Sequence, residues 1–153
     1  MKLIDILTES SIVADLQAKT KAEALDVLVD AMTKTHKTLN KSDILQVLLE
    51  REKLGSTGIG DGVAIPHGKS IALTQIVSGF GLAKRGIDFD SLDGKPAHLF
   101  FLLVAPEDSA GAHLKMLARI SRMLKNLEFR KRLLGANSQH EIYQIISEED
   151  AKY

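Results

Sequence analysis

The chain has 153 residues, of which 44% are hydrophobic, and it carries 20 basic residues against 20 acidic ones and no cysteine. The missing cysteine excludes disulfides, thiolate metal sites and a cysteine nucleophile, and the balanced charge gives no overall field that favours nucleic acid or an anionic membrane. At this length, residues 1–153 most simply form one domain with a sizeable core.

The N-terminal segment, residues 1–16, has acidic residues early and lacks a long apolar stretch, so it does not predict a signal peptide. No run in the chain approaches the roughly 18 apolar residues that a membrane span requires. We therefore expect a cytoplasmic protein without membrane insertion. Residues 11–16 are a possible edge strand.

Two amphipathic helices are predicted next. Thr20 and Glu23 stand at capping-box spacing, and the apolar residues behind them follow helical spacing at Leu25, Leu28, Val29 and Met32. Ser42 is predicted to cap the second helix. Its apolar arc contains Ile44, Leu45, Val47, Leu48 and Leu49. His36, in the polar link between the helices, is expected to be a solvated loop residue.

Charged residues end the second helix. Glu52 falls within the apolar arc, where a charge is costly unless it is paired or exposed by the helix end, and Arg51 falls at the edge of the arc. One interpretation is a solvated last turn, in which cations suit the helix dipole. The other is that Arg51 projects into a cleft beside the glycine-rich segment that follows.

That segment, residues 54–70, reads LGSTGIGDGVAIPHGKS and presents a histidine. Pro66 fixes its own φ and favours an extended conformation at Ile65, while Gly68 permits a turn and leaves room beside His67. With a reference pKa of about 6.5, a histidine near neutral pH is a nucleophile or a base. The alternative interpretation is a surface histidine in a turn at the end of a strand.

Two strands are predicted in the second half of the chain. Residues 76–82 form one, and the almost continuous apolar run over residues 98–105, ended by Pro106, forms the other. A run of this kind suits a strand buried on both faces. His98 is expected to be a strand-end residue.

Three helices are predicted after Pro106. The first begins at Ser109 or Gly111 and places His113 on the face of its core residues, where a capping or partly buried polar residue is one interpretation. Short helices over residues 127–134 and 138–146 follow, and Ser138 and Glu141 form a capping box at the start of the second. His140 is expected to be exposed. Solvated faces are expected for Arg119, Arg122, Lys125, Arg130, Lys131 and Arg132.

Several familiar motifs fail. Gly68-Lys69-Ser70 resembles the end of a Walker A loop, but that motif requires a glycine where Val63 stands. The glycine spacing does not fit a dinucleotide-binding turn, and no spacing indicates zinc. No metal or other cofactor is expected.

The run LLEREKLGSTGIGDGVAIPHGKS resembles the active-site signature of fructose/mannitol-type enzyme IIA domains of the bacterial phosphotransferase system (PTS), in particular their nitrogen-regulatory branch. The resemblance continues through GIDFDSLDGKPAHLFFLLVAP and AGAHLKMLARISRML and covers nearly the whole chain. It implies an α/β fold in which a mixed β-sheet is flanked by helices on both faces.

The resemblance also implies roles for individual residues. His67 of IPHGK is the phosphorylated histidine, His113 of AHL is a second pocket histidine that stabilises the phosphoryl group, and Arg51 of REK is the arginine beside the site. Asp61 stands where relatives vary, and it is given no role. The implied function is a phosphohistidine carrier that receives its phosphoryl group from an HPr-type protein and regulates partner proteins by its phosphorylation state.

Three alternatives stay open. A sugar-branch enzyme IIA would pass the phosphoryl group to a IIB domain during carbohydrate uptake. A protein- or ligand-binding domain would leave His67 unmodified. A hydrolase that uses His67 as a base is less favoured, because no serine or carboxylate partner is placed by a motif.

Overall fold

The computed structural model describes residues 1–153, apart from the side chain of Ala110. The helices are α1 (Lys21–Thr35), α2 (Lys41–Lys53), α3 (Ala110–Leu124), α4 (Leu127–Leu134) and α5 (Gln139–Asp150), with a short 3-10 turn, η1 (Leu3–Asp5), ahead of them. The strands are β1 (Leu7–Val13), β2 (Gly58–Gly60), β3 (Val63–Ala64), β4 (His67–Ser70), β5 (Val77–Ile87) and β6 (Ala97–Pro106).

Within the described chain the strands form one mixed sheet with β6 near its centre. The strand order is β1-β5-β6-β3-β2, and β4 pairs with a further stretch of β6. β5 runs antiparallel to β6, whereas β3 and β4 run parallel to it. Both edges of β6 are hydrogen bonded to neighbouring strands, and nine of its ten residues are buried, which confirms the predicted strand buried on both faces.

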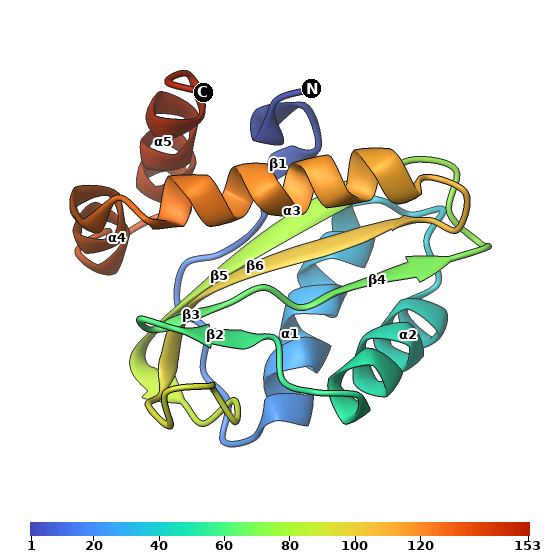
Figure 1. The fold of residues 1–153 in the computed structure, drawn as a ribbon, viewed down its shortest axis with the longest axis horizontal. Coiled ribbons are helices and arrows are strands. Elements are labelled where there is room, and N and C mark those ends of the chain that lie inside the picture. The colour runs from blue at the N-terminus through green and yellow to red at the C-terminus, as the bar shows by residue number, and fades with distance from the viewer.

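Alternate side chains of β6 enter two hydrophobic cores, one on each face of the sheet. Phe101 and Leu103 pack with residues of α3, α4 and α5, whereas Phe100 and Leu102 pack with residues of α1 and α2. Successive strand side chains point to opposite faces, so one apolar run fills both cores. Figure 1 shows the two groups of helices on either side of the strands. The predicted α/β fold, a mixed sheet with helices on both faces, is confirmed.

The helix starts follow local capping. Thr20 Oγ1 accepts a hydrogen bond from Glu23 N, as predicted for α1. The prediction that Ser42 caps α2 is wrong, because Asn40 has the extended backbone of a cap and its Oδ1 accepts from Asp43 N at 3.0 Å. None of the described helices combines the length and apolar character that a transmembrane segment needs.

The bounds of two strands differ from prediction because strand pairing extends them. The expected edge strand over residues 11–16 is β1, which does lie at the edge of the sheet but begins at Leu7. The register with β5 shifts between Leu7 and Ile12, and the consecutive residues Ser11 and Ile12 are both buried. The strand therefore lacks a regular alternation of buried and exposed residues. β5 continues beyond Leu82 to Ile87, which pairs with Ala97 across a second irregularity.

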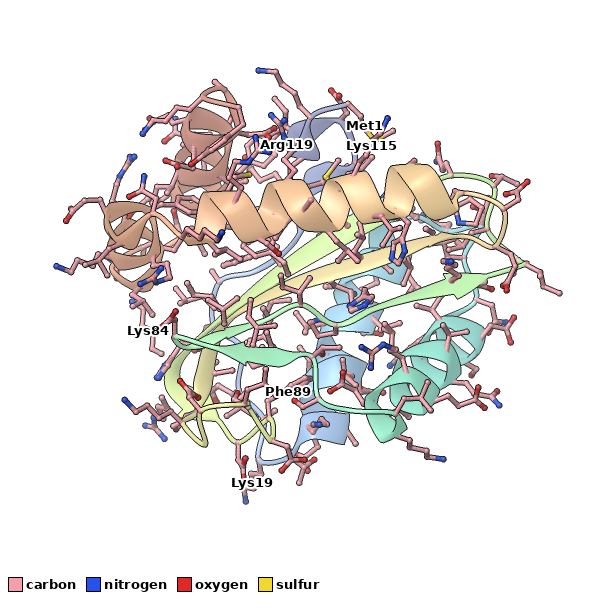
Figure 2. All side chains as sticks on the ribbon, in the orientation of Figure 1. Met1, Lys19, Lys84, Phe89, Lys115 and Arg119 are labelled. Carbon is pink, nitrogen blue, oxygen red and sulfur yellow. The ribbon has the colours of Figure 1, made fainter. Side chains whose placement is uncertain are left out.

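The prediction that Arg119 lies on a solvated face is wrong. Its Nε donates to Oδ1 of the fully buried Asp150 at 2.6 Å, and Ile4 N donates to the other carboxylate oxygen at 3.0 Å. The contact joins α3, α5 and the N-terminal segment, and Figure 2 shows Arg119 on the side of α3 that faces this segment. Of the other basic residues expected on solvated faces, Arg130 is half-buried and donates to the carbonyl oxygen of Leu124. The remaining four are exposed as predicted: Arg122, Lys125, Lys131 and Arg132.

Candidate functional site

His67 begins β4, which runs parallel to β6 in the register that β3 has already set. The strand start is fixed because Leu103 N donates to the carbonyl oxygen of the buried Pro66 at 3.0 Å. His67 is half-buried, and its Nδ1 lies 2.6 Å from the carbonyl oxygen of Ile65. A carbonyl only accepts hydrogen bonds, so Nδ1 carries the proton in this contact and the lone pair of the neutral ring is on Nε2.

Gly68 brings α2 against the start of β4. A Cβ atom at this position would lie 2.6 Å from Cγ1 of Val47, which is too close for any other residue without a shift. Val47 therefore fills the space that a side chain at position 68 would take, on the α2 side of β4. The close approach carries the C-terminal end of α2, with Arg51 and Glu52, toward His67.

Arg51 lies at that end of α2, against the glycine-rich segment. Its Nη1 donates to the carbonyl oxygen of Gly55 at 2.9 Å. The guanidinium is near enough to His67 for its positive charge to lower the pKa of that imidazole. A guanidinium has five N–H donors, so this contact leaves others free to bind an anion.

Glu52, the charged residue within the predicted apolar arc, is buried and paired. Its carboxylate accepts from Thr57 N and Thr57 Oγ1, and it forms an ion pair with Lys21 Nζ at 3.1 Å. The helical pattern indicated that this carboxylate needs a partner. Neither Lys21 nor Thr57 was identified from the sequence, because the pairing depends on how α1 and the glycine-rich segment pack.

His113 lies in the first turn of α3 and is 4% exposed. Its ring centroid is 5.6 Å from that of His67, and the two planes are tilted by 47°. Neither ring nitrogen of His113 has a hydrogen-bond partner among the described residues. A buried polar group without a partner is costly, so the site favours a guest that can accept a hydrogen bond from the N–H group of this ring.

Both rings are neutral near pH 7. Burial is the main cause that lowers the pKa of His67, and the Arg51 charge lowers it further, against the opposing effects of the Ile65 carbonyl and Glu52. Burial also lowers the pKa of His113, helped by the nearby His67 and Lys69. A neutral imidazole is the nucleophilic form, and the surrounding cations suit an anionic guest.

The remaining histidines lie outside this site. His98 is the second residue of β6 with its Nδ1 2.9 Å from Ala83 O, which confirms a strand-end residue, and His140 is exposed as predicted. His36 does lie in the link after α1, but the prediction that it is solvated is wrong, because it is half-buried and its Nε2 is buried without a partner among the described residues. No group of three His, Asp or Glu in the described part of the chain could hold a metal ion.

Comparison with known proteins identifies similar sequences over nearly the whole chain. The family model described as "Phosphoenolpyruvate-dependent sugar phosphotransferase system, EIIA 2" matches residues 5–149. A nitrogen regulatory protein of Bradyrhizobium diazoefficiens is 40% identical over 147 residues, which cover 96% of this chain and 95% of that protein. The fructose-specific EIIABC component of the Bacillus subtilis PTS is 39% identical over 150 residues, and the match spans 98% of this chain but 24% of that longer protein.

Solved structures of IIA proteins have a similar fold. The crystal structure of nitrogen regulatory protein IIA-Ntr from Neisseria meningitidis has a TM-score of 0.86 and 34% identity, covering 93% of this chain and 97% of that one. The mannitol IIA of Escherichia coli has a TM-score of 0.76 at 22% identity, covering 91% of this chain and 97% of that one. The second similarity concerns the fold alone.

Proposed function

This chain belongs to the EIIA 2 family of the phosphoenolpyruvate-dependent sugar phosphotransferase system, and from this membership we propose that it accepts a phosphoryl group on His67 from an HPr-type carrier. In this proposal its phosphorylation state then regulates partner proteins. The observation that carries the proposal is the position of His113. Its ring centroid lies 5.6 Å from that of His67, and its two buried nitrogens have no hydrogen-bond partner among the described residues. The similarity to nitrogen regulatory proteins supports the regulatory role.

The reacting atom in this proposal is Nε2 of His67. Its lone pair attacks the phosphorus atom of the carrier's phosphohistidine, and a new P–N bond forms while the carrier's P–N bond breaks. The electron pair of the broken bond returns to the carrier's imidazole nitrogen. The proton on Nδ1 is held by the Ile65 carbonyl throughout, so the step needs no separate base.

Arg51 and His113 stabilise the transferred group. Phosphoryl transfer depends mostly on positioning and on stabilising the charge spread over three equatorial oxygens. Arg51 supplies a planar guanidinium to these oxygens. His113 donates a hydrogen bond from the first turn of α3, where the helix dipole favours an anion.

A sugar-branch role is the second candidate, favoured by the similarity to the fructose-specific EIIABC component. In that role the chain would pass its phosphoryl group to a IIB domain. The two candidates share the first step, phosphorylation of His67, and differ in the protein that acts next. Offering the phosphorylated chain to a purified IIB domain separates them, because only a sugar-branch enzyme IIA loses its phosphoryl group there.

The experiment that tests the shared step is the intact mass of the wild type and of His67→Ala after incubation with phosphoenolpyruvate, enzyme I and an HPr-type carrier. We expect one added phosphoryl group on the wild type only. A phosphoramidate is labile to acid and survives base, so acid and alkali treatment identifies the linkage. If the carrier is charged and the wild type gains no mass, the chain is a binding domain and the proposal is wrong.

A further inference from the structure

We infer that Glu52 is a positioning residue, which anchors residues 54–57 and through them holds Arg51 beside His67. This inference rests on the proposed phosphoryl transfer, in which Arg51 stabilises the transferred group. It assigns to Glu52 a function in addition to its ion pair with Lys21.

The first step of the argument is the burial and bonding of the Glu52 carboxylate. Its side chain is 4% exposed. Thr57 N donates to both carboxylate oxygens at 3.2 Å, and Thr57 Oγ1 donates to one of them. A buried carboxylate is stable only when it is paired and hydrogen bonded. Thr57 is therefore bound to Glu52 by its backbone and its side chain together.

The second step is that Glu52 is itself held by a distant part of the chain. Lys21, at the start of α1, pairs with Glu52 at 3.1 Å and with Asp90 at 3.3 Å. The Lys21 ammonium also lies 4.8 Å from the centre of the Phe89 ring. Figure 2 shows Phe89 close to α1. These contacts hold the Glu52 carboxylate against α1. The bonds from Thr57 to this carboxylate therefore tie residues 54–57 to the rest of the fold.

The third step links the anchor to Arg51. Arg51 and Glu52 are consecutive residues of α2, and both bind the segment that follows, Arg51 at Gly55 O and Glu52 at Thr57. The segment is thus held at two points two residues apart. Without the Glu52 anchor, the carbonyl that orients the Arg51 guanidinium is no longer fixed. A displacement of about 1 Å in a catalytic group can lower a rate by about 100-fold.

The test compares Glu52→Ala and Glu52→Gln with Glu149→Ala. Glu149 is a second buried glutamate, bonded to Asn126, Lys152 and Tyr153 and outside the candidate site. We expect Glu52→Ala to slow phosphoryl acceptance by His67 about 10-fold without changing the half-saturating carrier concentration. Glu52→Gln, which keeps a hydrogen-bond acceptor, restores part of the rate. Glu149→Ala keeps the wild-type rate, and an equal loss in this control would overturn the inference.

A double-mutant cycle shows whether Glu52 acts through Arg51. In an Arg51→Ala background, we expect Glu52→Ala to change the rate by less than about twofold, because the group that it positions is already absent. If the two losses multiply, Glu52 acts independently of Arg51 and the inference is wrong. Thr57→Val removes one contact of the anchor and replaces Glu52→Ala in the cycle if that variant does not fold.

NMR titration of His67 tests the positioning without any phosphoryl transfer. Arg51 lowers the pKa of His67 more strongly than Glu52 raises it. Release of Arg51 in Glu52→Ala therefore raises this pKa, whereas loss of the Glu52 charge with Arg51 in place lowers it. A fall would contradict the inference. If the wild type accepts no phosphoryl group, the proposed function fails, and the direction of this shift still decides whether Glu52 positions Arg51.

Discussion

The imidazole rings of His67, at the start of β4, and His113, in the first turn of α3, have their centroids 5.6 Å apart and their planes tilted by 47°. The rings are not equivalent. His67 has the Ile65 carbonyl on Nδ1, whereas both nitrogens of His113 lack a partner among the described residues. The hydrogen bond to Ile65 therefore leaves the lone pair of the first ring on Nε2, whereas both nitrogens of the second ring are without a protein partner.

Replacing His67 with alanine is expected to abolish phosphoryl acceptance and leave the fold intact. The side chain is half-buried and makes one hydrogen bond, so we expect the melting temperature to change by less than about 4 °C. Intact mass and circular dichroism measure the two effects. The matched control is His98→Ala, which removes another half-buried, strand-end histidine bonded to a carbonyl and should accept the phosphoryl group normally.

Replacing His113 with leucine is expected to stabilise the protein while slowing phosphoryl transfer. Two buried nitrogens without partners cost about 1–3 kcal/mol each, and an apolar side chain of similar size removes this cost. Each kcal/mol gained raises the melting temperature by about 2–4 °C. Calorimetry and the rate of acceptance are measured on one preparation. A variant that is less stable than the wild type but transfers at the normal rate would contradict both expectations.

Arginine at position 51 should not be replaceable by lysine. Arg51→Lys keeps the positive charge but loses the planar fork that binds two phosphoryl oxygens at once. We expect a loss in transfer rate of about 10-fold or more, with Arg51→Ala slower still. Lys53→Ala, at the exposed end of the same helix, is the control and should transfer at the wild-type rate. Equal rates for Arg51→Lys and the wild type would show that only the positive charge at position 51 matters and that the planar guanidinium does not.

Acid is expected to destabilise the protein through its two site histidines. Burial lowers the pKa of both His67 and His113 below 6.5, so the unfolded chain binds their protons more readily than the folded protein. The free energy of unfolding therefore falls as the pH drops through 6.5. The charged and titratable groups beside the two rings are Arg51, Glu52 and Lys69.

Urea unfolding at about pH 7.5 and pH 5.5 measures this loss. We expect it to be smaller in His113→Leu than in the wild type, since one of the two titrating groups is gone. Phosphoryl acceptance should slow only below pH 6.5, because a protonated Nε2 has no lone pair. If the rate of phosphoryl acceptance begins to fall before the pH is lowered to 7.5, the protonation of a group other than His67 limits the rate.

The Arg119–Asp150 pair is expected to stabilise the fold without affecting the transfer rate. Asp150 is fully buried, so Arg119→Ala leaves a carboxylate without its cation, and breaking such a pair costs about 3–5 kcal/mol. Arg132→Ala breaks an exposed pair with Glu148 and should cost less than about 1 kcal/mol. Urea unfolding compares the two variants. Similar losses in both would show that the buried pair contributes no more than a surface pair.

Helix positions were predictable because their signals are local. Residues 127–134 were predicted as a helix and form α4 with the same bounds, where the apolar spacing and the cap lie within a few residues of one another. The last helix was predicted to end at 146 but continues to Asp150. Acidic residues at a helix C-terminus oppose the dipole, and here Glu149 and Asp150 are paired with Lys152 and Arg119. Lys152 lies only three residues after Glu149, but Arg119 lies 31 residues before Asp150, and sequence spacing does not reveal that partner.

Three segments of the candidate site could be predicted from the sequence alone. They are His67 directly after Pro66, the charged C-terminal end of the second helix, and a histidine on the core face of a later helix. These signals depend on backbone preferences and on periodicity over one or two turns. The resemblance to a known family implied that His113 lies near His67, but it is the packing of the folded chain that sets the 5.6 Å between their ring centroids, lets α2 approach β4 at Gly68, and pairs Lys21 with Glu52. Each of these contacts joins residues far apart in the chain, and packing between elements, rather than local preference, selects which of them meet.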